Sequence, residues 1–379
     1  MAESVTAERG VVIGGGLVGA ACAEMLFRRG CRVTVVEPGV VGGGATAAGM
    51  GHLVVMDDSP AQLALTSRSL ELWAELAPQL PARAEYRRCG TVWVAQDDEE
   101  LSAVMPKRAA YLAAGREAEL LGAAELARLE PDLRPGLAGG LRVPGDSVVY
   151  APVVARFLLE RAGAEVVHGR AAELVAGGVR LADGRVLRAD LTVVAAGIQA
   201  TELLPELPLR PRRGQLVITE RAGGLPGARV KHQLVELGYL KSAHGSDEDS
   251  VAFNVQPRAT GQLLIGSSRQ FGSSSAEIDW PLLRRMLARA VAYLPGLRHS
   301  AALRVWTGLR AASPDHLPIV GAHPDRAGVF LAVGHEGLGI TTALGTAEIL
   351  AAELGGASSP LSAHDFSARR AGLRQVAHA

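Results

Sequence analysis

Three glycines near the start of the chain have the spacing of a phosphate-binding turn. Gly14, Gly16 and Gly19 form the pattern G-x-G-x-x-G, and Glu37 follows Gly14 by 23 positions. The first glycine allows a tight turn, the second lets the backbone approach a pyrophosphate, and the third lets a helix pack closely on a sheet. The N-terminus of that helix offers free N–H groups and a partial positive charge to phosphates. The spacing therefore predicts a bound dinucleotide.

The surrounding residues have the strand, turn, helix and strand that this pattern requires. Residues 11–13 predict a short β-branched strand, and residues 17–29 predict a helix that Gly30 ends. Residues 32–36 predict a second strand with Glu37 at its end. A G-x-G-x-x-G pattern alone is a weak signal, but here the strands, the helix and the acid are all in place, so Glu37 is expected to bind a ribose.

Two other interpretations of the N-terminal stretch are disfavoured. Residues 11–23 are uncharged like the core of a signal peptide, but three glycines stand near its start, Glu24 follows at once and no cleavage region comes after it. The run is also shorter than the roughly 20 apolar residues that a membrane span needs. No other stretch reaches that length, so we expect neither export nor a transmembrane segment.

The composition indicates a globular protein with two domains. The chain has 379 residues, of which 48% are hydrophobic and 21% charged, and this excludes a disordered chain. Lys plus Arg and Asp plus Glu both number 39, so no net field favours nucleic acid or an anionic membrane. Cys22, Cys31 and Cys89 are spaced neither as a metal pair nor as a redox pair. We expect a reducing cytoplasm and no metal site.

The order of predicted elements indicates two interleaved domains. Strand and helix signals of the nucleotide-binding kind return after residue 150 and again after residue 328, while alternating strands fill much of residues 212–304. Between the first two parts, residues 86–96 predict a strand and residues 107–130 a helix. We assign a nucleotide-binding domain to residues 1–85, 145–211 and 305–379, and a substrate domain to residues 86–144 and 212–304.

The C-terminal unit indicates which dinucleotide to expect. Residues 328–354 predict a buried strand, a glycine loop and an alanine-rich helix that begins near residues 339–342. The N-terminus of this helix can face the negative charge that a reduced flavin carries near its N1 and O2 atoms. Residues 38–60 are rich in glycine and alanine, which suits backbone that passes against a flat ring. With one complete phosphate fingerprint in the chain, FAD is favoured over NAD.

Several motifs together resemble the D-amino-acid-oxidase-like family of FAD-dependent oxidoreductases, which includes glycine oxidase, sarcosine oxidases and D-amino-acid dehydrogenases. The resemblance covers nearly the whole chain and rests on GGGLVGAACA, GGGATAAGMGH, TVVAAGIQA, RRGQ, WTGLRAASPDHLPIVG and GHEGLGITTALGTA. It implies an α/β fold in which an FAD-binding Rossmann-like domain of the glutathione-reductase type is interleaved with an antiparallel-sheet substrate domain.

A narrower resemblance rests on AAGMGHLVVMDDSPAQLALT, VAFNVQPRATGQLLIGSSRQFG and GHEGLGITTA. These stretches are most similar to the flavoprotein subunit of bacterial D-hydroxyproline dehydrogenases. The hydrogen cyanide synthase flavoprotein and opine oxidase subunits are also similar, and they stay open as alternatives.

The family implies cofactor contacts at matched positions. Glu37 would hold the adenosine ribose and the glycine turn the pyrophosphate, while Ala172 and Gly197 would border the adenine side. The isoalloxazine would be lined by Thr46, Ala47, Gly49 and Met50, with residues 337–341 at its N1 and O2 edge. The positions expected to contact FAD are Gly14, Gly16, Leu17, Val18, Gly19, Glu37, Pro38, Gly44, Ala45, Thr46, Ala47, Gly49, Met50, Gly51, Ala172, Ala196, Gly197, Arg310, Gly337, Leu338, Gly339, Ile340 and Thr341. Sarcosine oxidases that tether flavin use a cysteine just after the WTGLR motif. This chain has Ala311 and Ala312 there, so FAD is expected to be non-covalent.

The family also implies catalytic positions. In WTGLR, Arg310 matches the arginine that binds the substrate carboxylate, and its planar fork suits bidentate binding; the alternative is a structural salt bridge at the domain boundary. His52 and His335, in glycine-rich segments, can tune the flavin, accept the amine proton or simply fill the loops. Tyr239, which shares a strand face with Lys241, is expected to roof the site or to lie on an ordinary sheet surface. Glu336 can bind a substrate ammonium or hydroxyl, or face solvent.

The predicted function is FAD-dependent oxidation of a D-amino or cyclic imino acid to the imine, by hydride transfer from Cα to flavin N5. The narrower resemblance implies cis-4-hydroxy-D-proline as substrate. The alternatives are a glycine or sarcosine oxidase, or a flavoprotein subunit that passes electrons to a partner; a non-enzymatic FAD-binding module would leave Arg310 unexplained. Three scattered cysteines cannot hold an iron–sulfur cluster, so the acceptor would be oxygen, a quinone or a partner subunit. A homo-oligomer and a peripheral position at the inner membrane face stay open.

Overall fold

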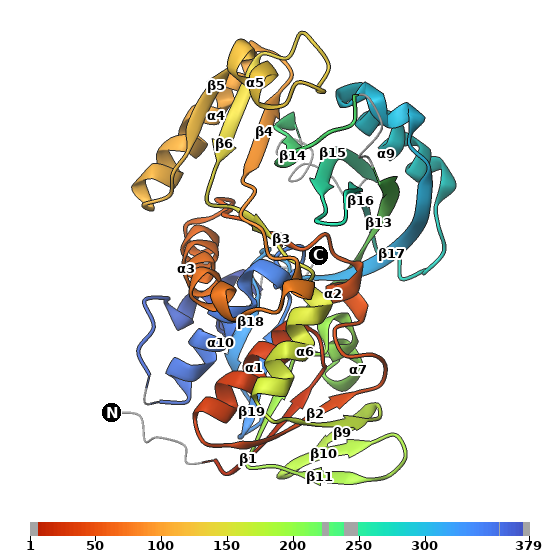
Figure 1. Ribbon diagram of the computed structural model, residues 1–379. Helices are drawn as coiled ribbons and strands as arrows, with labels where there is room; N and C mark the ends of the chain where they lie inside the picture. Colours follow the sequence, from red (N-terminus) through yellow and green to blue (C-terminus); the bar gives the residue numbers. More distant parts are fainter. Residues whose placement is uncertain (1–6, 222–226, 239–248, 356, 374–379) are drawn as a thin grey trace.

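The computed structural model describes residues 7–221, 227–238, 249–355 and 357–373, and it has two sheet-based parts, one above the other in Figure 1. The lower part is built on a six-stranded sheet. Its order is β18 (Ile319–Ala322), β19 (Val329–Val333), β12 (Leu191–Val194), β1 (Arg9–Ile13), β2 (Arg32–Glu37) and β8 (Glu165–His168). All neighbours are parallel except β18, which is antiparallel to β19.

Both faces of this sheet are covered, which explains the continuous apolar runs of its strands. Val12 of β1 packs into a core formed with α1 (Leu17–Arg28), α6 (Ala151–Arg161) and α10 (Gly339–Glu353), and α1 contacts both other helices. Val11 and Ile13 point the other way, toward a three-stranded sheet of β9 (Ala171–Val175), β10 (Gly178–Leu181) and β11 (Val186–Arg188). Alternate residues of one strand therefore belong to two cores.

The upper part is an eight-stranded sheet (Figure 1). Its order is β17 (Ala302–Ala312), β13 (Arg210–Arg221), β16 (Gln262–Phe271), β15 (Ser250–Pro257), β14 (Gln233–Glu236), β4 (Thr91–Ala95), β6 (Gly139–Val143) and β5 (Glu119–Gly122). Neighbours are antiparallel except for β14 and β4. Helix α9 (Trp280–Tyr293) packs on β15 and β16, and α4 (Asp98–Ala113) and α5 (Ala123–Leu129) lie at the other end.

The remaining elements lie outside the sheets described so far. They are α2 (Gly44–Ala48), the pair β3 (His52–Leu53) and β7 (Ser147–Val148), α3 (Pro60–Leu76), α7 (Ala200–Leu203), and 3-10 turns at Ala77–Gln79, Ala82–Ala84, Gly197–Gln199, Pro295–His299, Ala363–Phe366 and Ala371–Leu373. Strand β17 runs through residue 305, where the sequence suggested a domain boundary. The division of the chain into two domains therefore remains a proposal, with a long strand shared at its last boundary.

The predicted α/β fold is confirmed, and one predicted element is wrong. Residues 107–130 are not one helix: α4 ends at Ala113, β5 follows, and α5 begins at Ala123. Gly115 has φ of +70°, just after the C-cap of α4, and it stops the helix. Pairing with β6 then outweighs the helix propensity of residues 119–122. The predicted strand at residues 86–96 is shorter, because β4 begins at Thr91.

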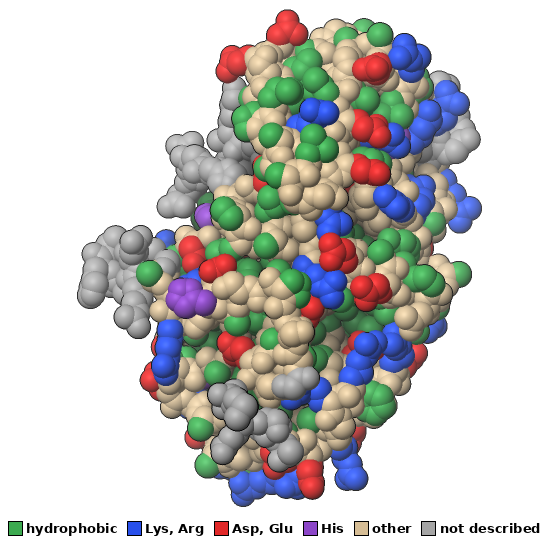
Figure 2. All heavy atoms as spheres, turned by 90° about the vertical axis from the view of Figure 1, so that its left-hand side faces the viewer, with side chains coloured by type: hydrophobic (Ala, Val, Ile, Leu, Met, Phe, Trp, Pro, Cys, Tyr) green, Lys and Arg blue, Asp and Glu red, His purple; other side chains and the backbone are tan. Residues whose placement is uncertain are grey.

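The surface carries both charges. On the face seen in Figure 2, acidic and basic side chains are intermingled, as expected from equal numbers of each in the sequence. Among the helices of the described residues, none has the length and apolar character needed to cross a bilayer.

Candidate active site

The glycine turn after β1 has no room for side chains. Gly14 has φ of +110°, and a Cβ atom there would lie 2.5 Å from Ala195 O. A Cβ atom on Gly19 would lie 1.9 Å from Gly14 O. The turn and the close approach of α1 to β1 therefore both require glycine. The N-terminus of α1 at Leu17 donates its backbone N–H to Thr46 Oγ1 at 3.0 Å, which joins α1 to α2.

Glu37 lies beside the same turn at the end of β2. Its Oε2 accepts a hydrogen bond from Gly15 N and its Oε1 one from Gly39 N, each at 2.8 Å. These bonds hold the half-buried carboxylate next to the phosphate-binding turn. This position suits a ribose that continues from a pyrophosphate on α1, and the ribose contact remains a prediction.

The two later glycine segments meet each other. Thr341 Oγ1 donates a hydrogen bond to His52 O at 2.9 Å, and Gly49 lies against Ile340. Met50 packs on Leu216 and other side chains of the eight-stranded sheet. The region that sequence reasoning assigned to a flat ring thus lies between the two parts of the molecule. The remaining expected contacts here are Gly44, Ala45, Thr46 and Ala47 in α2, Gly51 before β3, and Gly337, Leu338 and Gly339 at the start of α10.

Most of the other expected cofactor positions lie near the glycine turn, and Ala172 lies in a separate sheet. Ala196 and Gly197 follow β12 and approach the glycine turn, since the Ala196 Cα would lie 3.1 Å from a Cβ atom on Gly14. Gly16 is the N-cap of α1 and Val18 lies in its first turn, while Pro38 follows β2. Ala172 is exposed on β9, in the separate three-stranded sheet. Its predicted place near an adenine stays untested.

A cavity of about 150 Å³ lies where the start of α10 faces the eight-stranded sheet. His52, His335 and Glu336, which the sequence indicated, line it together with Gly337 and Leu338. From the large sheet, the lining includes Thr91, Trp93, Arg212, Asn254 and Arg269. Arg310 is not part of this lining. It lies beside it, because a Cβ atom on Gly337 would be 4.0 Å from Arg310 Cδ.

Within the part of the chain that the structure describes, the Arg310 guanidinium has one weak hydrogen bond, in which Nη1 donates to Ser268 O at 3.4 Å. No carboxylate of the described residues forms an ion pair with Arg310, so these residues do not support the alternative of a structural salt bridge. Burial of the guanidinium lowers its pKa below the ordinary range of arginine. An arginine that is desolvated without a carboxylate is suited to bind an anionic ligand.

Two more arginines surround this position, and sequence reasoning did not select them. Arg212 is opposite Arg310 in the register of β13 and β17, and it is only 4% exposed. Burial and the charge of Arg310 lower the pKa of Arg212 to about 10. Burial and the charges of Arg212 and Arg310 lower the pKa of Arg269 to about 8. Arg212 lies in RRGQ, which carried the family resemblance, and Arg269 lies in GSSRQFG, which carried the narrower one; these motifs were the signal available.

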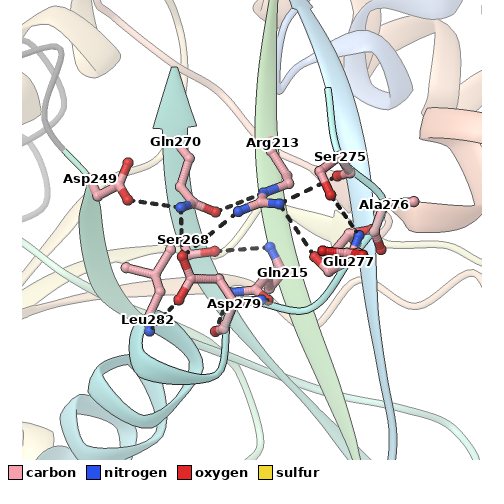
Figure 3. Close-up of polar contacts among 11 residues, drawn as sticks. Arg213, Gln215, Asp249, Ser268, Gln270, Ser275, Ala276, Glu277, Asp279 and Leu282 are labelled. Carbon is pink, nitrogen blue, oxygen red and sulfur yellow. Dashed lines mark hydrogen bonds and ion pairs between the residues drawn. The ribbon is translucent and has the colours of Figure 1, made fainter. Parts of the chain in front are cut away.

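Arg213 has a different role, because alternate residues of a strand point to opposite faces. Figure 3 shows its guanidinium held by Gln270 Oε1 at 2.7 Å and by backbone carbonyls of Ser275 and Glu277. Gln270 also bonds Asp279, whose other oxygen caps α9. This network ties β13 and β16 to α9. It fixes the strand from which Arg212 faces the cavity.

Two of the three histidines at the cavity, His52 and His335, are uncharged near neutral pH. Burial lowers the pKa of His335 to about 4, and its Nε2 is 2.9 Å from Thr346 Oγ1. Burial is also the main cause that lowers the pKa of His52, whose Nδ1 contacts Gln233 Oε1. A neutral imidazole can accept a proton or orient a neighbour, so both of the predicted functional roles stay open.

Glu336 is engaged by the protein. Its Oε1 forms an ion pair with Arg212, and its Oε2 is 2.9 Å from His316 Nδ1. Its backbone is left-handed, with φ of +48°, and its N–H donates to Ala311 O at 3.0 Å. The side chain is 13% exposed and faces Arg212. Tyr239 and Lys241, the predicted roof of the site, lie outside the described residues.

Comparisons with known proteins show the family. Residues 10–353 match the family model DAO, described as FAD dependent oxidoreductase. The chain belongs to this family.

Among its relatives, glycine oxidase from Geobacillus kaustophilus is 28% identical over 87% of this chain and 88% of its own length. Hydrogen cyanide synthase subunit HcnC from Pseudomonas aeruginosa is 29% identical over 95% of both chains. The crystal structure of the Geobacillus glycine oxidase superposes with a TM-score of 0.84 at 25% identity, covering 95% of this chain and 98% of that one. Iminodiacetate oxidase from Chelativorans sp. BNC1 follows with a TM-score of 0.80 at 26% identity, over 95% and 98%.

These matches confirm the predicted enzyme class, an FAD-dependent oxidoreductase of the amino-acid oxidase type, and the predicted cofactor. They support the DAO family as a whole and not the narrower resemblance to D-hydroxyproline dehydrogenase subunits. The DAO-type cradle in this chain fits FAD: the turn at Gly14 and Gly19 excludes side chains, and the first N–H groups of α1 and α10 have no intrahelical partner. When bound, FAD supplies a two-electron acceptor to the cavity.

Proposed function

We propose that this DAO-family protein oxidises the Cα–N bond of a small D-amino or cyclic imino acid to the imine, with cis-4-hydroxy-D-proline as the best single candidate. The observation that carries the proposal is the group of three arginines, Arg212, Arg269 and Arg310, beside a cavity that the start of α10 borders. Burial is the main cause that lowers the pKa of Arg212 and of Arg269, and the charges of the neighbouring arginines lower both pKa values further. A substrate carboxylate would relieve the repulsion between these charges.

Arg310 is the residue that we assign to the carboxylate. Arg212 is already paired with Glu336, whereas the Arg310 guanidinium has only the weak contact with Ser268 O. Its fork can bind both oxygens of a carboxylate and so fix the direction of the Cα–H bond. The substrate then loses a hydride from Cα to the flavin and a proton from nitrogen, which leaves the imine.

The size and polarity of the cavity support a small substrate. About 150 Å³ suits an amino acid with a short or cyclic side chain. The hydroxyl oxygen of Thr91 gives the lining a polar group for a ring hydroxyl, which favours hydroxyproline. The similarity to glycine oxidase and iminodiacetate oxidase favours the second candidate, oxidation of glycine, sarcosine or a related N-substituted glycine.

Anaerobic stopped-flow reduction of the flavin tests the proposal. Cis-4-hydroxy-D-proline, D-proline, glycine, sarcosine and iminodiacetate would each be mixed with the oxidised enzyme. We expect the fastest reduction by the hydroxyproline, and at least tenfold slower reduction in Arg310→Lys, which keeps the charge and loses the fork. Rapid reduction by glycine or sarcosine alone would select the second candidate. An unchanged rate in Arg310→Lys would remove Arg310 from the site.

Electrons leave the flavin to a partner subunit in this proposal, and the protein is cytoplasmic. The similarity to a hydrogen cyanide synthase subunit supports transfer to a partner subunit, and oxygen is the alternative. The three cysteines of the described residues are unpaired, which supports a cytoplasmic location. Co-purification of a second chain with the native enzyme, against oxygen consumption by the chain alone, separates the two acceptors.

A further inference from the structure

The side chain of Gln233 has a fixed orientation beneath the cavity. It is fully buried on β14, and its Nε2 donates to Ser147 O at 3.1 Å and to Thr91 Oγ1 at 3.3 Å. A backbone carbonyl can only accept a hydrogen bond, so the amide nitrogen must be on that side. Gln233 Oε1 is therefore the atom that faces His52, and it can only accept.

This orientation determines which nitrogen of His52 carries the proton. Nδ1 contacts Gln233 Oε1 and must donate to it. Burial lowers the pKa of His52, so the ring is neutral and Nε2 keeps its lone pair. The group 3.4 Å from Nε2 is Asn254 Nδ2. The Asn254 amide thus turns its N–H toward the imidazole, and its oxygen turns away.

Asn254 Oδ1 is consequently an acceptor without a donor. The atom is buried and has no hydrogen-bond partner among the described residues, while Asn254 itself lines the cavity. An amide oxygen left unpaired in a buried place destabilises the protein unless something else binds it. Because the oxygen is almost completely covered, a ligand in the cavity reaches it only if the Asn254 side chain shifts slightly, and such a ligand must donate an N–H or O–H.

We propose that Asn254 Oδ1 accepts a hydrogen bond from the amine N–H of the substrate, and that Gln233 and His52 fix its orientation. The inference rests on the proposed function and defines the substrate class as primary and secondary amines, because a tertiary amine has no N–H in the neutral form. An uncharged acceptor suits this step, since hydride loss requires a neutral nitrogen and a carboxylate would stabilise the ammonium form instead.

The charged side chains around the cavity also favour the neutral form of the substrate amine. Arg212 and Arg269 line it, with Arg310 beside it, and they disfavour an ammonium group. Asp58 and Glu336 are the acidic side chains in the lining, and Glu336 is paired with Arg212. His316 and His335 complete the titratable groups of the lining, and Arg258 acts on His52 through its charge.

Two non-oxidised ligands that differ in one atom test the inference in the FAD-loaded enzyme. Pyrrole-2-carboxylate presents an N–H where 2-furoate presents a ring oxygen, and their binding is read from the flavin absorbance spectrum. We expect the wild-type enzyme to bind pyrrole-2-carboxylate about tenfold more tightly. Asn254→Ala should bind the two ligands equally. Ser250→Ala, on the same strand and outside the cavity lining, should keep the wild-type preference.

A second variant reverses the polarity of the chain of hydrogen bonds. In Gln233→Glu one carboxylate oxygen loses the bond to Ser147 O and can accept only from the Thr91 hydroxyl. The other oxygen stabilises protonated His52, whose Nε2–H would donate to Asn254 Oδ1 and turn Nδ2 toward the cavity. The preference should then change to 2-furoate. Asn254 is the only asparagine of the chain. Labelling of the asparagine side chain with ¹⁵N therefore gives one carboxamide signal, which reports whether the Asn254 amide has rotated.

The outcomes separate the inference from the proposed function. Equal binding of both ligands by the wild-type enzyme, or an unchanged preference in Asn254→Ala, would overturn the role of Asn254 and leave the carboxylate site intact. If neither ligand perturbs the flavin or slows its reduction by substrate, the proposed function fails as well.

Discussion

Gly214 offers a way to displace Arg310 without changing it. Gly214 lies on β13, next to β17, and a Cβ atom there would be 2.5 Å from Arg310 Nη1, 2.8 Å from Nη2 and 2.9 Å from Cζ. Real Cβ atoms do not approach other atoms so closely. In Gly214→Ala, either the Arg310 guanidinium or the backbone of β13 must therefore move. The guanidinium is the end of a flexible side chain, whereas the backbone of β13 is paired with β17 at Gly214, and with β16 up to Arg213 and again from Val217. The guanidinium will move.

The size of the effect follows from the hydrogen bonds that the displaced fork can no longer form. A hydrogen bond to a charged group contributes about 1.5–3 kcal/mol, and each 1.4 kcal/mol is a factor of about ten in affinity. Loss of one such bond to the substrate carboxylate predicts an apparent Kd raised roughly 10- to 100-fold. The FAD content and the unfolding midpoint should change little, because the methyl group fills space that only Arg310 occupied.

The assay is anaerobic titration of flavin reduction with the best substrate from the panel. Gly122→Ala is the control: it lies at the end of edge strand β5, and its new Cβ atom would make only an ordinary contact, 3.7 Å from Glu125 Oε2. The double variant Gly214→Ala/Arg310→Lys should be little worse than Arg310→Lys, because both changes act through the same guanidinium. An unaltered Kd in Gly214→Ala, or additive losses in the double variant, would refute the reasoning.

Three further outcomes are expected. Acid or heat should release FAD without a covalent remnant, because Ala311 and Ala312 stand where a tethering cysteine would be; flavin that stays on the denatured chain would contradict this. Glu37→Ala should weaken FAD binding by about 1.5–3 kcal/mol for each charged hydrogen bond lost to the ribose, measured by equilibrium dialysis, with the circular dichroism of the apoprotein unchanged. Equal FAD affinity of variant and wild type would exclude Glu37 as the ribose ligand. Burial lowers the pKa of His335 to about 4 in the folded state, against 6.5 in a model peptide. As the pH falls from 6.5 to about 4, the unfolded state therefore takes up the proton first. The free energy of unfolding decreases over this range by at most roughly 3 kcal/mol. Chemical denaturation between pH 7 and pH 4 should show that the free energy of unfolding depends less steeply on pH in His335→Gln than in the wild type. The same slope in both proteins would show that His335 does not cause the loss of stability.

Local sequence signals predicted the nucleotide-binding part well because its constraints are local. The turn from β1 to α1 depends on Gly14 and Gly19, whose missing side chains are visible in the sequence and whose need is set by atoms only a few ångströms away. Helix caps elsewhere in the molecule are local in the same way, since Asp97 and Asp279 accept hydrogen bonds from backbone N–H groups three residues on. The helix expected at residues 107–130 failed for the opposite reason. There, pairing of β5 with a strand that comes later in the chain decided the structure.

The sequence by itself determined the type of cofactor, the family and the candidate Arg310, because each is carried by residue types at short, fixed spacings. Only the tertiary structure decided how the active site is composed. Arg212 and Arg213 are neighbours in the chain, yet one faces the cavity and the other is bound behind the sheet. Asn254 and His52 are 202 positions apart and meet within hydrogen-bond distance. Contacts of this kind depend on how strands pair across the whole fold, and no spacing along the chain records them.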